Sequence, residues 1–306
     1  VRGTTAPNPW VGCVIEPGGY EGATQPPGGP HAEAVALAAA SAGAAGATLY
    51  VTLEPCAHHG RTPPCAEAIV AAGVARVVVG LEDPDPQVRG RGIALLRAAG
   101  VEVAAGVAGA EIERQLAPYL KHRRTGRPWV VLKVAATLDG RTAAPDGTSQ
   151  WISGEASRAD AHRLRAAADA ALVGAGTVRA DDPSLTVRLA EGRDPVRVVL
   201  GRAPAGARVH PALELGGDLG EVLDDLGRRG MLEVVVEGGA TVAHDLHEAG
   251  LVDRYVLYLA PVLMGGDDGR PLFAGPGAAT LAAAWRGRIV GVERLGDDLK
   301  VELEPA

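Results

Sequence analysis

Hydrophobic and polar positions along the first part of this chain predict strands and helices in alternation. Short apolar runs rich in β-branched residues lie over 10–15, 48–53, 74–80 and 101–104 and are typical of strands. Between these runs, apolar residues recur at helical spacing after His31, after Cys65 and over 92–99. Strands that alternate with helices in this way predict βαβ units and a mainly parallel sheet.

The rest of the chain repeats the alternation. Strands are expected over 129–136, 170–174, 234–236 and 255–259, helices over 155–168 and 242–249, and a closing hairpin over 289–303. Between the two parts, residues 110–124 have helical spacing and end in a basic cluster, which complements a helix C-terminus, before Thr-Gly-Arg-Pro ends the helix. We therefore predict two α/β domains, residues 1–125 and 126–306.

Composition and charge narrow the class of protein. The chain has 306 residues, enough for two domains that each bury a core, and its 47% hydrophobic and 22% charged residues are typical of a globular protein. Its net charge of −7 predicts no nucleic-acid partner, so an anionic substrate would need local arginines. Three cysteines indicate a reducing, cytoplasmic setting, and no apolar run predicts a membrane span. We expect Cys13 to be a buried strand residue.

Three potential zinc ligands stand at the starts of predicted helices and at the end of a strand. His31 and Glu33 open one helix, Cys56 follows the strand 48–53, and Cys65 opens the next helix. Convergence of one histidine and two cysteines on a tetrahedral ion leaves the fourth position open, which is the pattern of a catalytic zinc site. Zinc lowers the pKa of bound water, and Glu33, not needed as a ligand, is free to move a proton to a departing amine. His-x-Glu followed by Pro-Cys and a further Cys is typical of zinc deaminases that act on nucleobases.

Two other interpretations remain open at this point. A purely structural zinc scaffold explains His31, Cys56 and Cys65 but gives Glu33 no task. A deaminase that edits nucleic acid, with an unrelated C-terminal domain, would need a basic groove bearing aromatic residues. The net charge and the 3% aromatic content do not favour such a groove.

The spacing of the two cysteines points to a particular family. Eight residues separate Cys56 from Cys65 and form a substrate-sized insertion at the mouth of the site. With this insertion, and with the segments 5–12, 82–86 and 90–92, the first domain resembles the deaminase half of the bifunctional bacterial riboflavin-biosynthesis deaminase–reductases. The resemblance implies a three-layer α/β/α fold like that of cytidine deaminases. It assigns contacts with the pyrimidine and the phosphate to Asn8, His58 and Arg61, although Asn8 can simply stabilise its turn and Arg61 can be solvated.

The second part of the chain resembles the reductase half of the same enzymes, an α/β fold like that of dihydrofolate reductase that uses NADPH. A strand followed by Gly238-Gly239 and a helix is suited to bind phosphate. By position, the cofactor would be lined by Ala135, Trp151, Thr177, Asp181, Gly239, Ala240 and Thr241. The substrate would face Lys133, Ser149, Arg165, Leu185, Arg188 and Glu237. Two arginines suit a sugar phosphate, although each can also be a solvated surface charge, and Trp151 can equally belong to the core.

One segment departs from the family pattern. Between Arg188 and Glu237 the family usually has a longer stretch with another strand and helix, whereas residues 201–220 have the composition of a loop. This departure predicts a reduced adenosine side of the cofactor site, leaves the preference for NADPH over NADH open, and allows a chain whose reductase half is inactive. Residues 174–177 are expected to form a turn bracketed by glycines.

The resemblance implies two consecutive steps of riboflavin synthesis. The first is the zinc-dependent hydrolytic deamination of 2,5-diamino-6-ribosylamino-4(3H)-pyrimidinone 5′-phosphate, with Glu33 as the catalytic acid–base. The second is the NADPH-dependent reduction of the ribosyl group to ribityl, for which the sequence indicates binding residues but no proton donor. We also expect a homodimer or a higher homo-oligomer, because folds of these two kinds commonly pair through sheet or helix faces.

Overall fold

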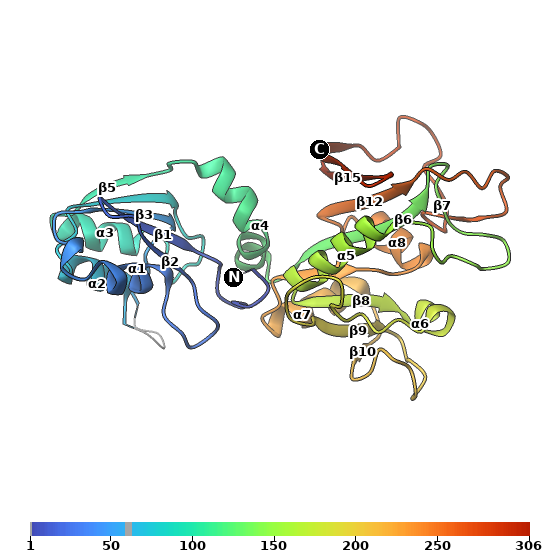
Figure 1. Cartoon of the computed structure of the whole chain (residues 1–306), viewed down its shortest axis with the longest axis horizontal. Coiled ribbons are helices and arrows are strands. Elements are labelled where there is room, and N and C mark those ends of the chain that lie inside the picture. Colours follow the sequence, from blue (N-terminus) through green and yellow to red (C-terminus); the bar gives the residue numbers. More distant parts are fainter. Residues whose placement is uncertain (1, 59–62) are drawn as a thin grey trace. The chain divides into compact units, whose positions relative to one another are not determined.

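The computed structural model describes residues 2–58 and 63–306, and the chain forms two compact units. The first unit ends at Arg127 and the second begins at Pro128 (Figure 1). Both units are α/β, as the alternating pattern predicts. No helix among the described residues is both long enough and apolar enough to cross a membrane.

A five-stranded sheet in the order β2-β1-β3-β4-β5 forms the centre of the first unit. The hairpin of β1 and β2 lies at one edge, whereas β3, β4 and β5 run parallel because a helix connects each strand to the next. The strands are β1 (Gly12–Glu16), β2 (Tyr20–Ala23), β3 (Thr48–Leu53), β4 (Arg76–Leu81) and β5 (Glu102–Ala105). The helices are α1 (Ala32–Ala40), α2 (Cys65–Ala71), α3 (Arg91–Ala98) and α4 (Gly109–Thr125), with a 3-10 turn η1 (Ser41–Ala44).

Helices cover both faces of this sheet. A side chain at Gly22 would point at α1, because its Cβ would lie 2.1 Å from the carbonyl oxygen of Ala32. Cys13 is paired with Gly22 and therefore shares that face, where it is buried as expected. A Cβ at Gly80 would instead meet Ile112 of α4, at 2.1 Å. The first unit thus has helix, sheet and helix layers, and the close approach of α1 needs glycine at position 22.

An eight-stranded sheet in the order β10-β9-β8-β11-β6-β12-β15-β14 forms the second unit. Its strands from β10 to β12 run parallel, and β15 and β14 add an antiparallel edge. The strands are β6 (Trp129–Thr137), β8 (Ala170–Gly174), β9 (Val196–Leu200), β10 (Leu213–Leu215), β11 (Glu233–Val236), β12 (Arg254–Ala260), β14 (Gly287–Leu295) and β15 (Asp298–Pro305). A separate two-stranded ribbon joins β7 (Arg141–Ala143) to β13 (Arg270–Pro271).

The core of the second unit fills both sides of its sheet. The helices are α5 (Glu155–Ala167), α6 (Ala175–Asp181), α7 (Leu219–Arg228) and α8 (Ala240–Glu248). On one side, Leu223 of α7 and Leu246 of α8 pack against alternate residues of β6 and β11. On the other side, Ala161 of α5 packs against Tyr258 of β12. Fully buried strands such as β8 and β11 are nearly continuous apolar runs because helices cover both faces.

Two expectations for the second unit are wrong. Residues 201–220 are not all loop, because they contain β10 and the start of α7. The repeat of Leu219, Val222 and Leu226 after the N-cap Asp218 carries a helical signal, which the glycines on both sides of it obscure. Residues 174–177 are not a turn, because Gly174 is the last residue of β8 and α6 begins at Ala175.

Candidate functional site

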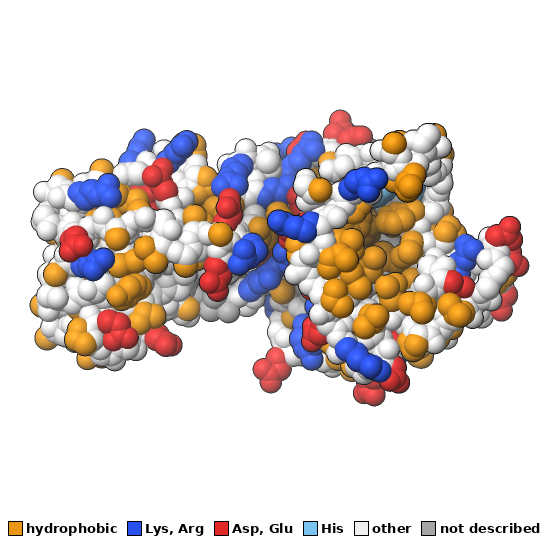
Figure 2. Space-filling view, turned by 90° about the horizontal axis from the view of Figure 1, so that it is seen from above, with side chains coloured by type: hydrophobic (Ala, Val, Ile, Leu, Met, Phe, Trp, Pro, Cys, Tyr) orange, Lys and Arg blue, Asp and Glu red, His pale blue; other side chains and the backbone are white. Residues whose placement is uncertain are grey.

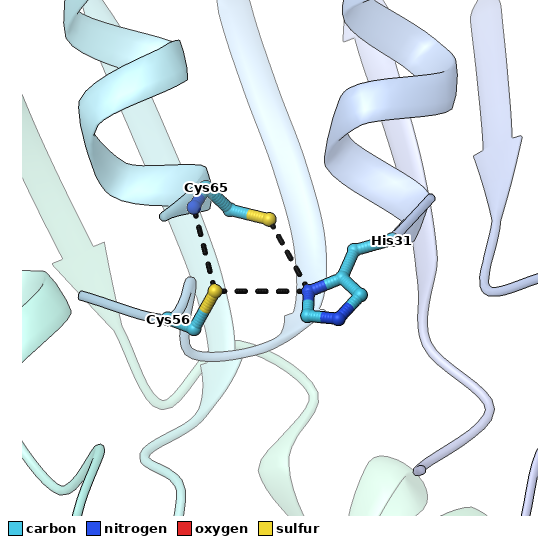
Figure 3. A group of neighbouring side chains, drawn as sticks. All are labelled: His31, Cys56 and Cys65. Atoms are coloured by element: carbon cyan, nitrogen blue, oxygen red, sulfur yellow. Dashed lines mark hydrogen bonds between the residues drawn. The ribbon is translucent and has the colours of Figure 1, made fainter. Parts of the chain in front are cut away.

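The three predicted zinc ligands converge in the first unit. His31 precedes α1, Cys56 follows β3, and Cys65 is the first residue of α2, so that each lies where an element begins or ends (Figure 3). The Nδ1 atom of His31 lies 3.6 Å from Sγ of Cys56 and 3.4 Å from Sγ of Cys65. All three ligand atoms lie within 4.8 Å of one another. One imidazole nitrogen and two sulfurs at this spacing fit a single zinc ion with one open coordination position.

Backbone contacts fix the relative positions of the two cysteines. The amide of Cys65 donates to Sγ of Cys56 at 3.4 Å, and the amide of Ala66 donates to the carbonyl oxygen of Cys56 at 3.0 Å. A hydrogen bond from the Cys65 side chain lowers the pKa of the Cys56 thiol to about 4, although burial opposes this shift. The site is therefore arranged to hold a thiolate, the form of cysteine that binds metal.

Glu33 lies in the first turn of α1 beside the ligands and is only 4% exposed. Burial is the main cause that raises the pKa of its carboxyl group to about 7. Its side chain lines the same cavity as His31 and Cys56. This is the position required of a group that moves a proton between a metal-activated water and a leaving amine.

A cavity of about 340 Å³ is lined by two of the three ligands, His31 and Cys56. Two of the three predicted substrate contacts line it, Asn8 from the turn before β1 and His58 from the segment after Cys56. The third, Arg61, lies outside the residues that the structure describes. The Pro7-Asn8-Pro9 turn is held by Arg123 of α4, whose guanidinium donates to the carbonyl oxygen of Pro7 at 3.1 Å.

The acidic and aromatic side of this cavity contains no residue to which a site role is assigned from the sequence. Asp83, Tyr119 and Arg123 all line it. The hydroxyl of Tyr119 donates to Asp83 at 3.0 Å, and the guanidinium of Arg123 lies over the Tyr119 ring and 3.6 Å from the carboxylate of Asp85. Because Arg123 belongs to a basic run at a helix end, its sequence context predicted only a favourable interaction with the helix dipole.

A buried carboxylate supports the loop behind the metal ligands. Glu54, at the end of β3, accepts hydrogen bonds from the amides of Asp83 (3.3 Å), Gly90 (2.9 Å) and Ile93 (3.1 Å). These amides belong to the loop after β4 and to the first turn of α3. Glu54 therefore fixes the segment 82–93, part of which lines the cavity, to the chain two residues before Cys56.

A second cavity, of about 690 Å³, lies in the second unit. Three of the predicted substrate-facing residues form an ion-pair network in its wall. Glu237, after β11, accepts from Nη2 of Arg165 at 2.8 Å and from its Nε, and lies 3.4 Å from Nζ of Lys133. Burial alone would raise the pKa of Glu237, but Lys133 and Arg165 outweigh it and lower this pKa to about 2.

The structure brings nearly all the other predicted reductase residues to the same cavity. Its lining includes Ala135, Ser149, Trp151, Thr177, Asp181, Leu185, Arg188, Gly239 and Ala240. Thr241 does not line the cavity and is exposed in the first turn of α8. Trp151 is not a core residue, because 71% of its surface is exposed and Arg158 lies over its ring at 4.7 Å.

The cavity offers a place for a nucleotide phosphate. Gly239 caps the N-terminus of α8 without a side-chain hydrogen bond, so amides of the first turn remain available to an anion. A Cβ at Gly239 would lie only 3.2 Å from Oγ1 of Thr177, which shows how closely these two elements approach. The volume, the glycines and the helix N-terminus together fit a nucleotide cofactor.

Three further side chains of this region were not singled out by the sequence. His162 of α5 and Ser184 line the cavity, and the hydroxyl of Thr186 lies 3.0 Å from that of Ser184. In the sequence, His162 stands in a basic, polar stretch of a helix and carries no mark of a site. Ser184 and Thr186 flank Leu185, which the resemblance places beside the substrate.

Two family models match the chain, one for each unit. The model of the cytidine and deoxycytidylate deaminase zinc-binding region matches residues 2–81. The model of the RibD C-terminal domain matches residues 128–301, more than half of the chain. These matches confirm the cytidine-deaminase-like fold expected for the first domain and the dihydrofolate-reductase-like fold expected for the second.

Whole-length relatives show the same pairing of domains. The riboflavin biosynthesis protein RibD of Escherichia coli K12 is 41% identical, over 99% of this chain and 95% of its own length. The structure of Acinetobacter baumannii RibD (form 1) is 39% identical with a TM-score of 0.93 and covers 99% of this chain and 94% of that one. A Thermotoga maritima structure is 36% identical with a TM-score of 0.91 and covers 100% and 94%; it is titled a diaminohydroxyphosphoribosylaminopyrimidine deaminase/5-amino-6-(5-phosphoribosylamino)uracil reductase.

The zinc-ligand geometry, the two cavities and the match along the whole chain agree on one assignment. The chain belongs to the RibD family and is a deaminase and reductase of riboflavin biosynthesis.

Proposed function

We propose that this chain deaminates the diaminopyrimidinone ribosyl phosphate in its first unit and reduces the ribosyl group of the product, with NADPH, in its second. The observation that carries the proposal is that one chain contains two sites. The first unit has a His-Cys-Cys ligand set beside a buried glutamate, and the second unit has a separate cavity around Lys133, Arg165 and Glu237. The T. maritima protein, whose title names both activities, matches the chain over its whole length.

In the deaminase cavity, His31, Cys56 and Cys65 would hold the zinc ion. Zinc supplies Lewis-acid activation of water for attack on the ring carbon that bears the amine. Glu33 would take a proton from the attacking water and pass it to the leaving amine, which its buried position in the same cavity as His31 and Cys56 allows. Asn8 would orient the pyrimidine, because the hydrogen bond from Arg123 to Pro7 holds the turn that carries Asn8 in place.

In the reductase cavity, the nicotinamide cofactor would lie between Ala135, Thr177 and the N-terminus of α8 and supply a hydride. Lys133 supplies the proton to the oxygen released at C1′ as the ribosyl ring opens. Among the described residues it is the only lysine that lines the cavity, and Glu237 holds its amino group in place at 3.4 Å. Arg165 and Arg188 bind the phosphate.

The charge of the cavity wall supports a preference for NADPH. Arg208, Arg270 and Asp181 all line the cavity, and burial raises the pKa of Asp181 while the charge of Arg270 opposes this effect. Guanidinium groups suit the additional phosphate that distinguishes NADPH from NADH. The presence of β9, β10 and α7 beside this region supports a complete nucleotide site.

A homodimer would use the antiparallel edge of the second sheet. Strand β14 is the last strand of that sheet and exposes Ile289 (60%) and Val292 (64%). Figure 2 shows that hydrophobic side chains gather on one face of this unit. An unprotected apolar edge strand is a template for pairing with another chain, and we propose that a second copy covers it.

The free cysteines suit a cytoplasmic protein.

The test is a coupled assay of the zinc-loaded protein with the diaminopyrimidinone ribosyl phosphate and either NADPH or NADH. Mass spectrometry of the products identifies deamination and reduction separately. The proposal expects both products, with NADPH preferred over NADH. A deaminated product that is never reduced with either nucleotide would contradict the reductase assignment, and an unchanged substrate would contradict both.

A further inference from the structure

His162 occupies a place in the reductase cavity for which the mechanism above has no role. It lies on α5, one turn before Arg165, and only 5% of its surface is exposed. Its side chain belongs to the cavity wall together with Arg188 and Ser184. A buried histidine that lines a substrate cavity must satisfy both ring nitrogens or present one of them to the ligand.

One hydrogen bond fixes which nitrogen carries the proton. The backbone amide of Arg188 donates to Nδ1 of His162 at 2.9 Å, so Nδ1 presents its lone pair. A neutral ring in this state carries its proton on Nε2. Burial, and then the charges of Arg165 and Arg188, lower the pKa of His162 to about 4, while Glu237 opposes the shift and Lys133 reinforces it. The ring is therefore neutral at physiological pH, with Nε2 as a donor.

The Nε2–H donor of His162 faces a second donor, the guanidinium of Arg165. Nε2 of His162 lies 3.4 Å from Nη1 of Arg165, and neither N–H can accept from the other. Arg165 has its own acceptors, since Nη1 donates to the carbonyl oxygen of Thr186 and its other nitrogens donate to Glu237. Within residues 2–58 and 63–306, no oxygen accepts from Nε2 of His162. Two N–H donors at this separation form a site that an oxygen of a ligand can share.

The adjacent segment adds donors of the same kind. Nη1 of Arg188 donates to the hydroxyl of Thr186 at 2.6 Å and to that of Ser184. The hydroxyl oxygens accept from this guanidinium and lie 3.0 Å from each other, so one hydroxyl donates to the other and the proton of the second remains available to a further acceptor. In the described part of the chain, Glu237 is the only carboxylate bonded to the side chains of His162, Arg165, Ser184, Thr186 and Arg188, and Lys133 and Arg165 already pair it. The cluster therefore favours an anion with several oxygens, which is a phosphate.

We propose that His162 is a positioning and binding residue for the substrate phosphate in the reduction step. Its Nε2–H donates, together with Arg165, to a phosphate oxygen, and its Nδ1 holds the segment that carries Leu185 and Arg188 against α5. The inference rests on the reductase activity proposed above and adds a residue to it. A phosphate of the nicotinamide cofactor has the same chemistry, so the test must separate the two ligands.

The test compares His162→Leu with His162→Gln in the full-length chain. Leucine removes both hydrogen bonds, whereas glutamine offers an acceptor for the Arg188 amide and a donor toward the phosphate. We expect His162→Leu to raise the KM for the deaminated ribosyl phosphate roughly ten- to hundredfold, with the KM for NADPH within about twofold of wild type. His162→Gln should recover most of this loss. His210→Leu, which changes a histidine outside the cavity lining, is the matched control.

Each alternative outcome is distinguishable. An unchanged substrate KM in His162→Leu overturns the proposal, and so does a rise confined to the KM for NADPH, which would place the cofactor phosphate at this cluster. Nitrogen-15 NMR of the wild-type histidines gives a second criterion that does not depend on folding of a variant. If NMR finds the proton on Nδ1 of His162, the proposal is overturned as well. A wild-type protein that oxidises no NADPH with this substrate refutes the proposed reductase function itself, whatever the tautomer.

Discussion

Replacement of Glu54 by alanine should loosen the loop behind the zinc ligands while leaving the reductase unit intact. The Glu54 side chain is 4% exposed and accepts from three backbone amides, those of Asp83, Gly90 and Ile93. Alanine fills none of these acceptor positions. The substitution therefore leaves three donors without partners in a place that water reaches poorly.

The expected loss of stability in Glu54→Ala follows from the number and kind of hydrogen bonds lost. A hydrogen bond to a charged group contributes about 1.5–3 kcal/mol, and a buried donor left unpaired costs about 1–3 kcal/mol. Because the loop can relax and the Gly90 amide is only partly buried, we expect a total cost of roughly 3–6 kcal/mol, below the sum of the separate maxima. A domain is typically stable by about 5–15 kcal/mol, so local opening of residues 82–93 is expected before global unfolding.

Amide hydrogen exchange measures this opening directly. Since about 1.4 kcal/mol corresponds to a factor of ten, the amides of Gly90 and Ile93 should exchange at least roughly a hundredfold faster in Glu54→Ala. Deaminase activity should fall, because Asp83 and Val88 of this segment line the cavity, whereas NADPH oxidation on the deaminated substrate should be unchanged.

Glu82→Ala is the matched control. Glu82 belongs to the same loop but is half exposed and pairs with Arg89 at 3.4 Å, an interaction typically worth at most about 1 kcal/mol. It should leave both the exchange rates and the activity near those of wild type. Protection of Gly90 and Ile93 that survives in Glu54→Ala, or a loss equally large in Glu82→Ala, would refute the reasoning.

Three further predictions concern the two sites. Glu237→Gln should abolish reduction and spare deamination in the same preparation, because it removes the counter-charge of Lys133 and Arg165; equal loss of both activities would count against it. The pKa of Glu237 is about 2 in the folded protein, below its ordinary value of 4.5. Its contribution to stability is therefore complete above pH 4.5 and is lost as the pH falls toward 2. Acid titration followed by circular dichroism should show a shallower loss of stability with falling pH in Glu237→Gln than in the wild type. Gly92→Ala should lower the affinity for zinc, measured by competition with a chelator, because the new Cβ would lie 1.8 Å from the carbonyl oxygen of Pro55, next to the ligand Cys56. Gly109→Ala, whose Cβ would have its nearest contact at 3.6 Å, should leave the zinc affinity unchanged.

The metal site could be predicted from sequence because its ligands stand at boundaries that the hydrophobic pattern marks. Each of His31, Cys56 and Cys65 lies where a predicted strand ends or a predicted helix begins, and such ends meet at one edge of a parallel sheet. The pattern therefore places the side chains, and their chemistry then identifies the site. Glu33 follows from its place in the same helical turn.

Long-range contacts could not be predicted in this way. Arg123 reaches Pro7 across 116 positions, and nothing in its basic neighbourhood distinguishes it from a solvated helix end. His162 depends on a bond to the backbone of Arg188, which only the path of the segment 182–188 creates. The same limit applies to α7, whose helical repeat is clear but lies between glycine-rich segments that have the composition of a loop.

The most direct test of the two-site account follows ammonia release and NADPH oxidation separately in one preparation, for the wild-type chain and for Glu33→Gln, each loaded with zinc. The account predicts that the wild type performs both reactions. Glu33→Gln should release ammonia at least about a hundredfold more slowly and yet reduce the deaminated substrate at the wild-type rate. Undiminished ammonia release by Glu33→Gln would contradict the account.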